Sequence, residues 1–357
     1  MATVTKSIGT LSRDYSTITL WEADLDNGAI YSAGDDAQGE CYNDSPFDES
    51  VTIDGGGTIG LNSVTLTVPV SERHDGTAGS GARIIYSSQG TVISVGATIS
   101  TTISWLELKQ TGTGNANKFN VSTAADNGIT HNINNLLISG IAAGSQSFRN
   151  YYGIWTGGKS GSTRNAFDNI VYNISHASGG SPIGMNLSGA GTANSYNNTV
   201  FNVADAGGTL GTGINSSAAS GDTQNSIAMD SGGSDFAGTP IGNEDHNLSS
   251  DATAAGTGSL TNKLSANQFV SNTDPYDLHL KTGADAIDAG VDLITTPTGV
   301  NIDIDGRDRD AQGDIWDMGA DEFVAAAGGG RIMSSLVRAG GLAGAGGIAG
   351  KGGGLAG

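Results

Sequence analysis

Asn169-Ile-Val-Tyr172 is one of several stretches in which an asparagine precedes a β-branched or apolar patch. The others are Asn135-Leu-Leu-Ile138, Asn198-Thr-Val-Phe201, Asn225-Ser-Ile227 and Asn247-Leu248. Successive asparagines of this set lie 34, 29, 27 and 22 residues apart. Steps of this size are typical of a parallel β-solenoid, in which one coil contributes two or three short strands and as many corners.

Short alternating stretches precede this repeat. Val64-Thr-Leu66-Thr-Val68-Pro-Val70 directs every second side chain to one apolar face, as a β-strand does. Similar stretches follow at 84–86, 92–95 and 103–108, between clusters of Gly, Ser, Thr, Asn and Asp that predict turns. Helical periodicity is nearly absent after residue 30, so the chain is predicted to be all-β.

The spacing of the repeat favours a solenoid over a β-sandwich, which would give turn signals every 8–12 residues or so without a longer period. In a solenoid each strand pairs with its copies in the coils above and below, so that like side chains stack in ladders. Asparagine and glycine tolerate the positive φ that sharp corners need. We therefore interpret the repeated asparagines as corner and ladder residues rather than as ligands.

Composition and charge exclude several classes of protein. The 357 residues include 57 glycines, which excludes a long-helix or coiled-coil protein. The 36 acidic residues outnumber the 16 basic ones, and a net charge of −20 argues against nucleic acid as a partner. Cys41 is the only cysteine, which excludes a disulfide or zinc scaffold. No apolar run is long enough for membrane insertion, and the first residues lack the apolar core of a secretion signal.

The two ends of the solenoid are predicted to be covered, because an open end exposes unpaired strand edges. Ser16-Thr-Ile18-Thr-Leu-Trp21-Glu-Ala-Asp-Leu25 has apolar residues at helical spacing, with Ser16 as candidate N-cap. We expect a short capping helix that buries Trp21 and Leu25; a partner-binding helix is the alternative. The predicted organisation is an N-terminal cap and first coil (1–50), a β-helix body (51–273), closing coils with a C-terminal cap (274–327) and a glycine-rich tail (328–357).

The segment before the tail carries a recognisable set of motifs. These are Gly283-Ala-Asp-Ala286-Ile287-Asp288-Ala289-Gly290, Asp303-Ile-Asp305-Gly306-Arg307 and Asp317-Met-Gly319-Ala320-Asp321-Glu322-Phe323. They resemble the closing segment of right-handed, single-stranded parallel β-helix proteins of bacteria and their tailed phages. Arg307 directly follows Gly306, where the family usually has a proline beside the arginine, so the local turn is expected to differ. The resemblance implies a fold and says little about function.

The opening of the chain, with Asp14-Tyr15, Trp21-Glu22 and Gly39-Glu-Cys41-Tyr42, looks like the start of β-helix proteins from the structural regions of tailed-phage genomes. This second resemblance implies a virion protein that is made in the host cytoplasm. It also implies a homotrimer, since parallel β-helices in virions are often trimeric.

The tail is basic on an acidic body. After Glu322 the charged residues are Arg331, Arg338 and Lys351, and glycine recurs every third residue from 341 to 353. A disordered linker, packed glycine-rich helices and a docking peptide are the open interpretations. The residues expected to anchor the chain are Arg331, Leu336, Arg338, Leu342, Ile348, Lys351 and Leu355.

A search for catalytic residues finds no recurring carboxylate pair in the middle coils, so we lean against an enzyme; if the chain is one, a polysaccharide lyase or glycoside hydrolase fits the fold. Asp168, with Arg164 and His176 nearby, is the best local cluster, and we interpret it as a corner with a solvated charge. His279, between Leu278 and Leu280, is expected on the outer face of a strand. No catalytic residue and no cofactor are therefore predicted.

Two candidate binding sites are predicted. Asn301, Asp303 and Asp305, followed by Gly306, match the first half of a calcium loop, although the bidentate ligand at the twelfth position is missing. Arg307 and Arg309 are expected to neutralise the acids of this loop instead. Tyr151, Tyr152 and Trp155 are the densest aromatic group and are candidates to stack on carbohydrate, against the alternative of a core stack.

Three functions follow from these observations. The first is a non-enzymatic phage virion protein, either a head decoration protein or a fibre, bound to other capsid or tail proteins. The second is a receptor-binding tail fibre or tailspike that binds or cleaves host surface polysaccharide. The third is a bacterial surface adhesin, which would need an export signal upstream.

Overall fold

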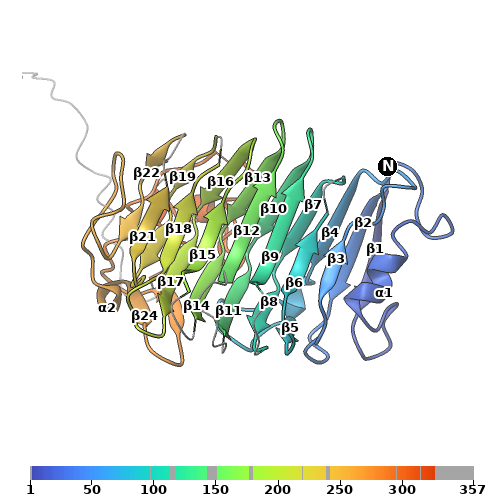
Figure 1. Cartoon of the computed structure of the whole chain (residues 1–357), viewed down its shortest axis with the longest axis horizontal. Coiled ribbons are helices and arrows are strands. Elements are labelled where there is room, and N and C mark those ends of the chain that lie inside the picture. Colours follow the sequence, from blue (N-terminus) through green and yellow to red (C-terminus); the bar gives the residue numbers. More distant parts are fainter. Residues whose placement is uncertain are drawn as a thin grey trace, which may run out of the picture. The chain divides into compact units, whose positions relative to one another are not determined.

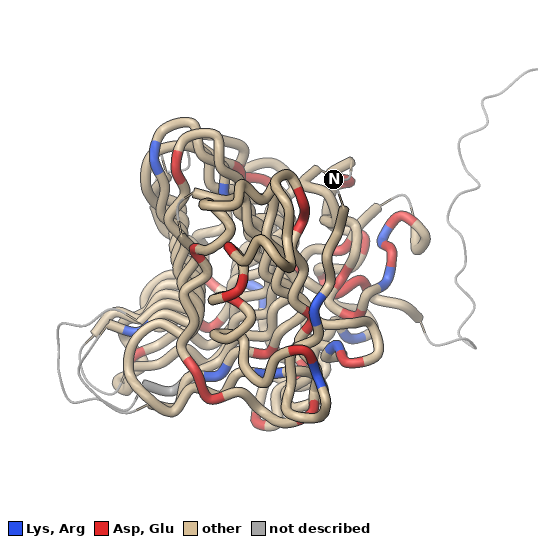
Figure 2. Tube along the Cα trace, turned by 90° about the vertical axis from the view of Figure 1, so that its right-hand side faces the viewer, with Lys and Arg blue, Asp and Glu red and all other residues tan. Residues whose placement is uncertain are grey.

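Parallel strands stack along the chain into a β-solenoid of about seven coils in this computed structural model (Figure 1). The structure describes residues 2–96, 98–112, 117–142, 151–176, 180–218, 220–238, 242–294, 296–313 and 315–325. Viewed along the solenoid, the coils superpose on one another (Figure 2). The prediction of an all-β chain of stacked parallel coils is confirmed.

Three parallel sheets form the walls of the solenoid. Sheet A contains β1 (Thr3–Ile8), β2 (Asp36–Cys41), β4 (Ser63–Thr67), β7 (Thr101–Ser104), β10 (Thr130–Asn134), β13 (Thr163–Phe167), β16 (Thr192–Tyr196), β19 (Thr223–Gln224) and β22 (Glu244–Asp245). Sheet B contains β5 (Arg83–Tyr86), β8 (Glu107–Gln110), β11 (Leu137–Ala142), β14 (Ile170–His176), β17 (Thr199–Asp205), β20 (Ile227–Met229) and β23 (Leu248–Ser249). Sheet C contains β3 (Val51–Ile53), β6 (Thr91–Val95), β9 (Lys118–Ala125), β12 (Tyr151–Gly158), β15 (Pro182–Leu187), β18 (Thr212–Ser216) and β21 (Ser234–Gly238).

Apolar side chains stack in register inside the solenoid. In sheet B the register places Leu108, Ile138, Val171 and Val200 in successive coils, and none of these side chains is exposed. Burying one such side chain stabilises the fold by about 1.5–3 kcal/mol. The ladder therefore stabilises both the interior and the pairing register, because a slip of one residue would turn these side chains outward.

The corner between sheets A and B is built by two adjacent rows of residues. The first row has positive φ angles between 50° and 65°: Trp105, Asn135, Asp168, Asn197, Asn225 and His246. In the second row, the Asn169 Oδ1 accepts the Leu136 backbone N–H at 3.0 Å, and the Asn198 Oδ1 accepts that of Asn169 at 3.0 Å. The asparagines of the sequence repeat therefore do not occupy equivalent positions. Asn135 and Asn225 belong to the first row, and Asn169, Asn198 and Asn247 belong to the second.

The helix α1 (Ile18–Ala23) begins one residue later than predicted. Its N-cap is Thr17, whose side-chain oxygen accepts the Leu20 backbone N–H at 3.2 Å, and not Ser16. Trp21 is completely buried, and its Nε1–H donates to the Tyr31 hydroxyl at 3.1 Å. The helix contacts β1, β2 and β3 at the N-terminal end of the solenoid (Figure 1).

The segment 274–323, which we name the closing segment, adds no strand to sheets A, B or C among its described residues. With β24 (Phe269–Ser271) its strand β25 (Asp277–Leu280) forms an antiparallel pair. The other short elements of the chain are α2 (Ser265–Gln268) and the 3-10 helices η1 (Val70–Glu72) and η2 (Arg309–Ala311). Where the sequence led us to expect closing coils, the chain runs back along the flank of the solenoid instead.

Three corner residues hold the closing segment on this flank. The Asn225 Nδ2–H donates to the Val291 carbonyl at 2.7 Å, and the Asn197 Nδ2–H donates to that of Val300 at 3.0 Å. In an earlier coil, the Asn135 Nδ2–H donates to the Asp303 carbonyl at 2.9 Å. The closing segment thus passes the coils in the reverse of their chain order.

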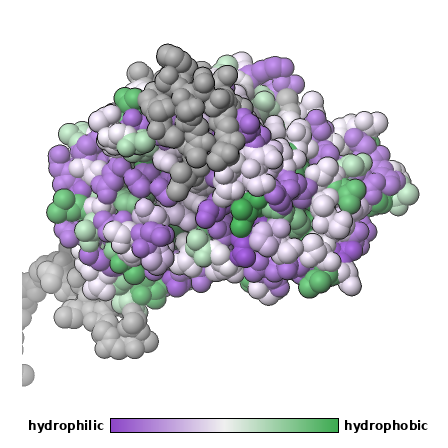
Figure 3. Space-filling model, turned by 60° about the horizontal axis from the view of Figure 1, so that its bottom comes forward, coloured by the Kyte–Doolittle hydropathy of each residue, from purple (hydrophilic) through white to green (hydrophobic). Residues whose placement is uncertain are grey.

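Apolar residues of the closing segment cover the outer face of sheet B. This outer core contains Leu278, Leu280, Ala286, Ile304 and Met318 from the closing segment, packed with Leu137, Ile170, Tyr172, Phe201, Ile227 and Met229 from sheet B. From β11 to β23 sheet B is therefore buried on both faces, which explains why these strands are rich in apolar residues on both faces. Where the chain remains exposed, polar side chains predominate and apolar ones are scattered (Figure 3).

Residues 1–323 form one compact unit, which contains the predicted cap, body and closing segment, and residues 324–357 form a second. The glycine-rich tail, 328–357, lies outside the described residues, and so do all seven residues expected to anchor the chain. None of the helices in the described part of the chain is long and apolar enough to cross a membrane.

Candidate functional site

A groove of about 760 Å³ lies where the closing segment meets the outer face of sheet B. Its lining combines both elements and the loop after η1: Thr77, Ala78, Lys109, Ser139, Gly140, Tyr172, Asn173, Asp274, Pro275, Tyr276 and Asp277. The size is that of a small-molecule site. These residues are far apart in the chain, so no local sequence pattern marks them as a site.

Two tyrosines give the groove an aromatic wall. The Tyr172 and Tyr276 rings meet edge to face with centroids 5.5 Å apart, and Phe201 supports Tyr276 from behind at 5.9 Å. Tyr172 is buried, and this burial raises the pKa of its hydroxyl. Lys109 and Asp274 are exposed and carry opposite charges. The tyrosine rings can pack against a flat apolar face of a ligand, and the charged and amide side chains beside them can hydrogen-bond to its polar groups.

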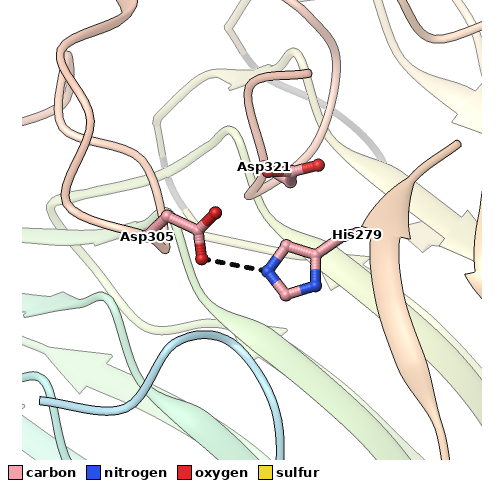
Figure 4. A group of neighbouring side chains, drawn as sticks. All are labelled: His279, Asp305 and Asp321. Atoms are coloured by element: carbon pink, nitrogen blue, oxygen red, sulfur yellow. Dashed lines mark hydrogen bonds and ion pairs between the residues drawn. The ribbon is translucent and has the colours of Figure 1, made fainter. Parts of the chain in front are cut away.

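His279 lies two residues after the groove residue Asp277, on the same strand β25. Its Nδ1 lies 2.6 Å from the Asp277 Oδ1. Its Nε2 lies 3.0 Å from the Asp305 Oδ1, the contact that the dashed line in Figure 4 marks. Burial lowers the pKa of His279, but the hydrogen bond to Asp305 and the charges of Asp321 and Asp305 outweigh burial and raise the pKa to about 10. From the sequence, His279 was expected on the outer face of a strand. That expectation does not include its contact with Asp305, 26 residues further along the chain.

Asp321 completes this cluster. Its Oδ2 accepts the Leu280 backbone N–H at 2.7 Å, and its Oδ1 is buried without a hydrogen-bond partner. Burial raises the pKa of Asp321 to about 6. The Arg307 guanidinium lies beside it, with Nη1 2.5 Å from the Asp305 Oδ2 and 3.7 Å from the Asp321 Oδ1.

The loop after η1 closes over the imidazole from the other side. Gly76 has a φ of +79°, and a Cβ there would lie 2.5 Å from the His279 Nε2. Only glycine combines this backbone conformation with such a close approach. The ligand atoms of His279, Asp305 and Asp321 all lie within 4.8 Å of one another, a spacing that suits a metal ion.

The predicted calcium residues do not gather around one point. The Asp303 Oδ1 accepts the backbone N–H groups of Asp305 and Arg307, at 3.0 and 2.7 Å, so this carboxylate holds the loop itself. The Asn301 Nδ2–H donates to Asp308 at 3.0 Å. Asp305 turns instead to His279 and Arg307.

The predicted aromatic group divides between the two faces of sheet C. Tyr151 is buried in the main core and packs against His176 with ring centroids 4.5 Å apart. Tyr152 and Trp155 are half-buried on the other face, where Tyr152 stacks on Phe119 at 5.0 Å. The core interpretation therefore holds for Tyr151, and a stacking surface remains only at Tyr152 and Trp155.

The interpretation of Asp168 as a solvated corner charge is wrong. Asp168 does lie at a corner, but it is completely buried and pairs with Arg309 of the closing segment at 2.9 Å. Burial raises the pKa of Asp168 well above its usual range, against the opposing effect of Arg309. Arg309 also pairs with Glu322 at 3.1 Å, so it neutralises acids outside its own loop.

No protein-family model matches the chain, and a search of curated proteins finds no match.

Proposed function

We propose that the chain is a non-enzymatic structural protein of a phage virion, a β-helical head decoration protein or fibre displayed on the particle. The observation that carries this proposal is the continuous parallel ladder from β1 to β22, which makes the body a stiff, self-contained element. The opening and closing motifs, which resemble those of phage β-helix proteins, support it. In this proposal the solenoid is right-handed, as in that family.

Helix α1 serves as the N-terminal cap in this proposal. It contacts the first strands of the solenoid and buries Ile18 and Trp21. A covered end prevents strand-by-strand addition of other chains, which a displayed protein must avoid at high copy number. The glycine-rich tail, 328–357, anchors the protein to capsid or tail proteins or packs the tip of a homotrimer.

Mass spectrometry of purified particles tests the virion location. We expect the chain among the virion proteins and a chain truncated after residue 327 to be lost from particles. Because residues 1–323 form a unit of their own, the truncated chain should stay folded. Absence of the full chain from particles refutes the virion role, and normal incorporation of the truncated chain refutes the anchoring role.

The groove favours one second candidate, a receptor-binding fibre or spike that binds a host surface glycan. Tyr276 and Lys109 offer a ring face and a cation in the same groove. Binding of host capsule or lipopolysaccharide by the chain, lost in Tyr276→Ala and kept in Tyr152→Ala, would support it. Release of reducing sugar would further indicate a lyase or hydrolase, whereas display on bacterial cells without phage would favour a surface adhesin.

A further inference from the structure

We propose that His279, Asp305 and Asp321 bind a divalent transition-metal ion, with Zn²⁺ as the best-fitting ion. This inference is independent of the proposed virion role. The three residues come from β25, from the loop before η2 and from the last described turns, so one ion would join three parts of the closing segment. One imidazole nitrogen and two carboxylate oxygens form a donor set that Zn²⁺ accepts and that Ca²⁺ does not favour.

The distances permit a shared ion. The His279 Nε2 and the Asp305 Oδ1 lie 3.0 Å apart, and the three ligand atoms lie within 4.8 Å of one another. Ligands on one tetrahedral zinc, with bonds of about 2.1 Å, lie about 3.4 Å apart. A small inward movement of the Asp321 carboxylate therefore completes the set.

Asp321 supplies an observation that does not depend on the clustering itself. Its side chain is 4% exposed, and its Oδ1 has no hydrogen-bond partner, although the Arg307 Nη1 lies 3.7 Å away. A buried carboxylate oxygen without a hydrogen bond is costly, and the partly exposed Arg307 guanidinium is too far for one, which leaves this oxygen open to a closer cation. The Oδ2 of the same carboxylate is fixed by the Leu280 backbone N–H, which holds Asp321 in place beside His279.

Asp277 supplies the outer-shell contact that metal-binding histidines usually have. Its Oδ1 accepts the His279 Nδ1–H at 2.6 Å. This bond orients the ring, so that when Nε2 gives up the proton that it donates to Asp305, the lone pair left on Nε2 faces Asp305. The arrangement is the carboxylate–histidine pair that supports zinc in many proteins.

Arg307 is the competing cation. Its guanidinium lies against the Asp305 Oδ2 at 2.5 Å, where it offsets the charge of the two carboxylates. The Arg307 side chain is 44% exposed, so it can swing into solvent when a metal ion enters. In the metal-bound state, the ion therefore replaces the Arg307 guanidinium as the cation beside Asp305 and Asp321.

Calorimetric titration of the full, chelator-treated chain with Zn²⁺ alone tests this inference, with Co²⁺ absorption as the reporter of nitrogen and oxygen ligation. We expect saturable binding of one ion per chain. Asp321→Asn and His279→Gln should each lose this binding, and Asp277→Asn should weaken it by about 10–100-fold. Arg307→Gln should strengthen it, because the competing cation is gone.

The control is His246→Gln, which disrupts another half-buried histidine–aspartate pair, His246 with Asp245 at 3.2 Å, outside the cluster. This variant should bind zinc as the wild-type chain does. If Asp321→Asn fails to fold, two other measurements test the site: the weaker binding expected in Asp277→Asn, and the Co²⁺ spectrum of the wild-type chain. Absence of saturable binding, or binding that persists in His279→Gln, overturns the proposal.

Discussion

Arg309 and Asp168 form a buried ion pair across 141 residues of sequence, with the guanidinium Nη2 2.9 Å from the carboxylate Oδ1. Neither side chain is exposed. Arg309 also donates to Glu322 at 3.1 Å and to the Gly319 carbonyl at 2.9 Å. The pair joins the closing segment, which contributes residues to both the groove and the histidine cluster, to a corner of the solenoid.

Replacing Arg309 by methionine should destabilise the fold strongly. The substitution leaves Asp168 and Glu322 buried without their cation, and breaking a buried pair in this way costs about 3–5 kcal/mol. Lys263→Met is the matched control, since Lys263 and Asp285 are 28% and 38% exposed and such a pair contributes about 1 kcal/mol or less. Urea unfolding measures both; equal losses would contradict the structural role of Arg309.

Removing a ladder asparagine should also be costly. The Asn198 Oδ1 accepts the Asn169 backbone N–H at 3.0 Å, and its Nδ2–H donates to the Ala166 carbonyl at 2.8 Å. Asn198→Ala leaves these buried groups without partners, which costs about 1–3 kcal/mol. The half-buried Asn194 of the neighbouring strand is the control, and Asn194→Ala should lower the free energy of unfolding by less. The reverse order would show that the inner ladder is not what holds the corner.

Trp21→Ala tests the helix at the N-terminal end. Trp21 is completely buried, and truncation of such a side chain costs about 3–5 kcal/mol. Leu20, on the same helix, is 52% exposed, so Leu20→Ala should leave the melting temperature nearly unchanged. If Trp21→Ala left the melting temperature unchanged and Leu20→Ala lowered it, the opposite face of α1 would be the buried one.

Acid should weaken the fold through His74. Its Nε2–H donates to the Asn135 carbonyl at 2.9 Å, and its Nδ1 accepts the Gly76 backbone N–H at 3.3 Å, so the neutral ring is fully bonded. Burial lowers the pKa of His74 from 6.5 to about 4. Because the unfolded chain binds the proton near pH 6.5 and the folded chain only near pH 4, this contribution is present above pH 6.5 and lost as the pH falls toward 4.

The loss over this window amounts to about 3 kcal/mol. His74→Gln keeps an amide donor for the same carbonyl and removes the titration. The stability of the wild-type chain relative to this variant, measured by urea unfolding, should therefore shrink between pH 7 and about pH 4.5. A difference that stays constant across this range would show that His74 is not held neutral.

The stacked coils could be predicted from the sequence because each coil repeats local signals. Asparagine and apolar patches recur at coil length, and the alternation from Val64 to Val70 marks a strand. The exact row of each asparagine could not be predicted, since a residue with positive φ and its inward neighbour are adjacent and both can be asparagine. At Asn225 the asparagine takes the positive φ, and Ser226 takes the place in the second row that Asn169 and Asn198 take in other coils.

The path of the closing segment and the site it forms could not be predicted, because their contacts join residues far apart in the chain. One signal did exist. Leu137, Ile170 and Phe201 are apolar residues on the outer face of sheet B, so the runs around them indicate a sheet that is covered on both sides. The sequence does not say which segment covers it, and the roles of Tyr276 and His279 follow only from that choice.

Hydrogen exchange of the wild-type chain tests most directly the central claim that residues 300–323 are clamped on the flank of the solenoid. The backbone N–H of Gly319 donates to the Asn225 carbonyl at 2.6 Å, and that of Ala320 donates to the Thr199 hydroxyl at 3.0 Å. We expect these amides to be protected as strongly as those of the inner strands, and to lose protection in Arg309→Met. Rapid exchange of this segment in the wild-type chain, beside a protected body, would contradict the account.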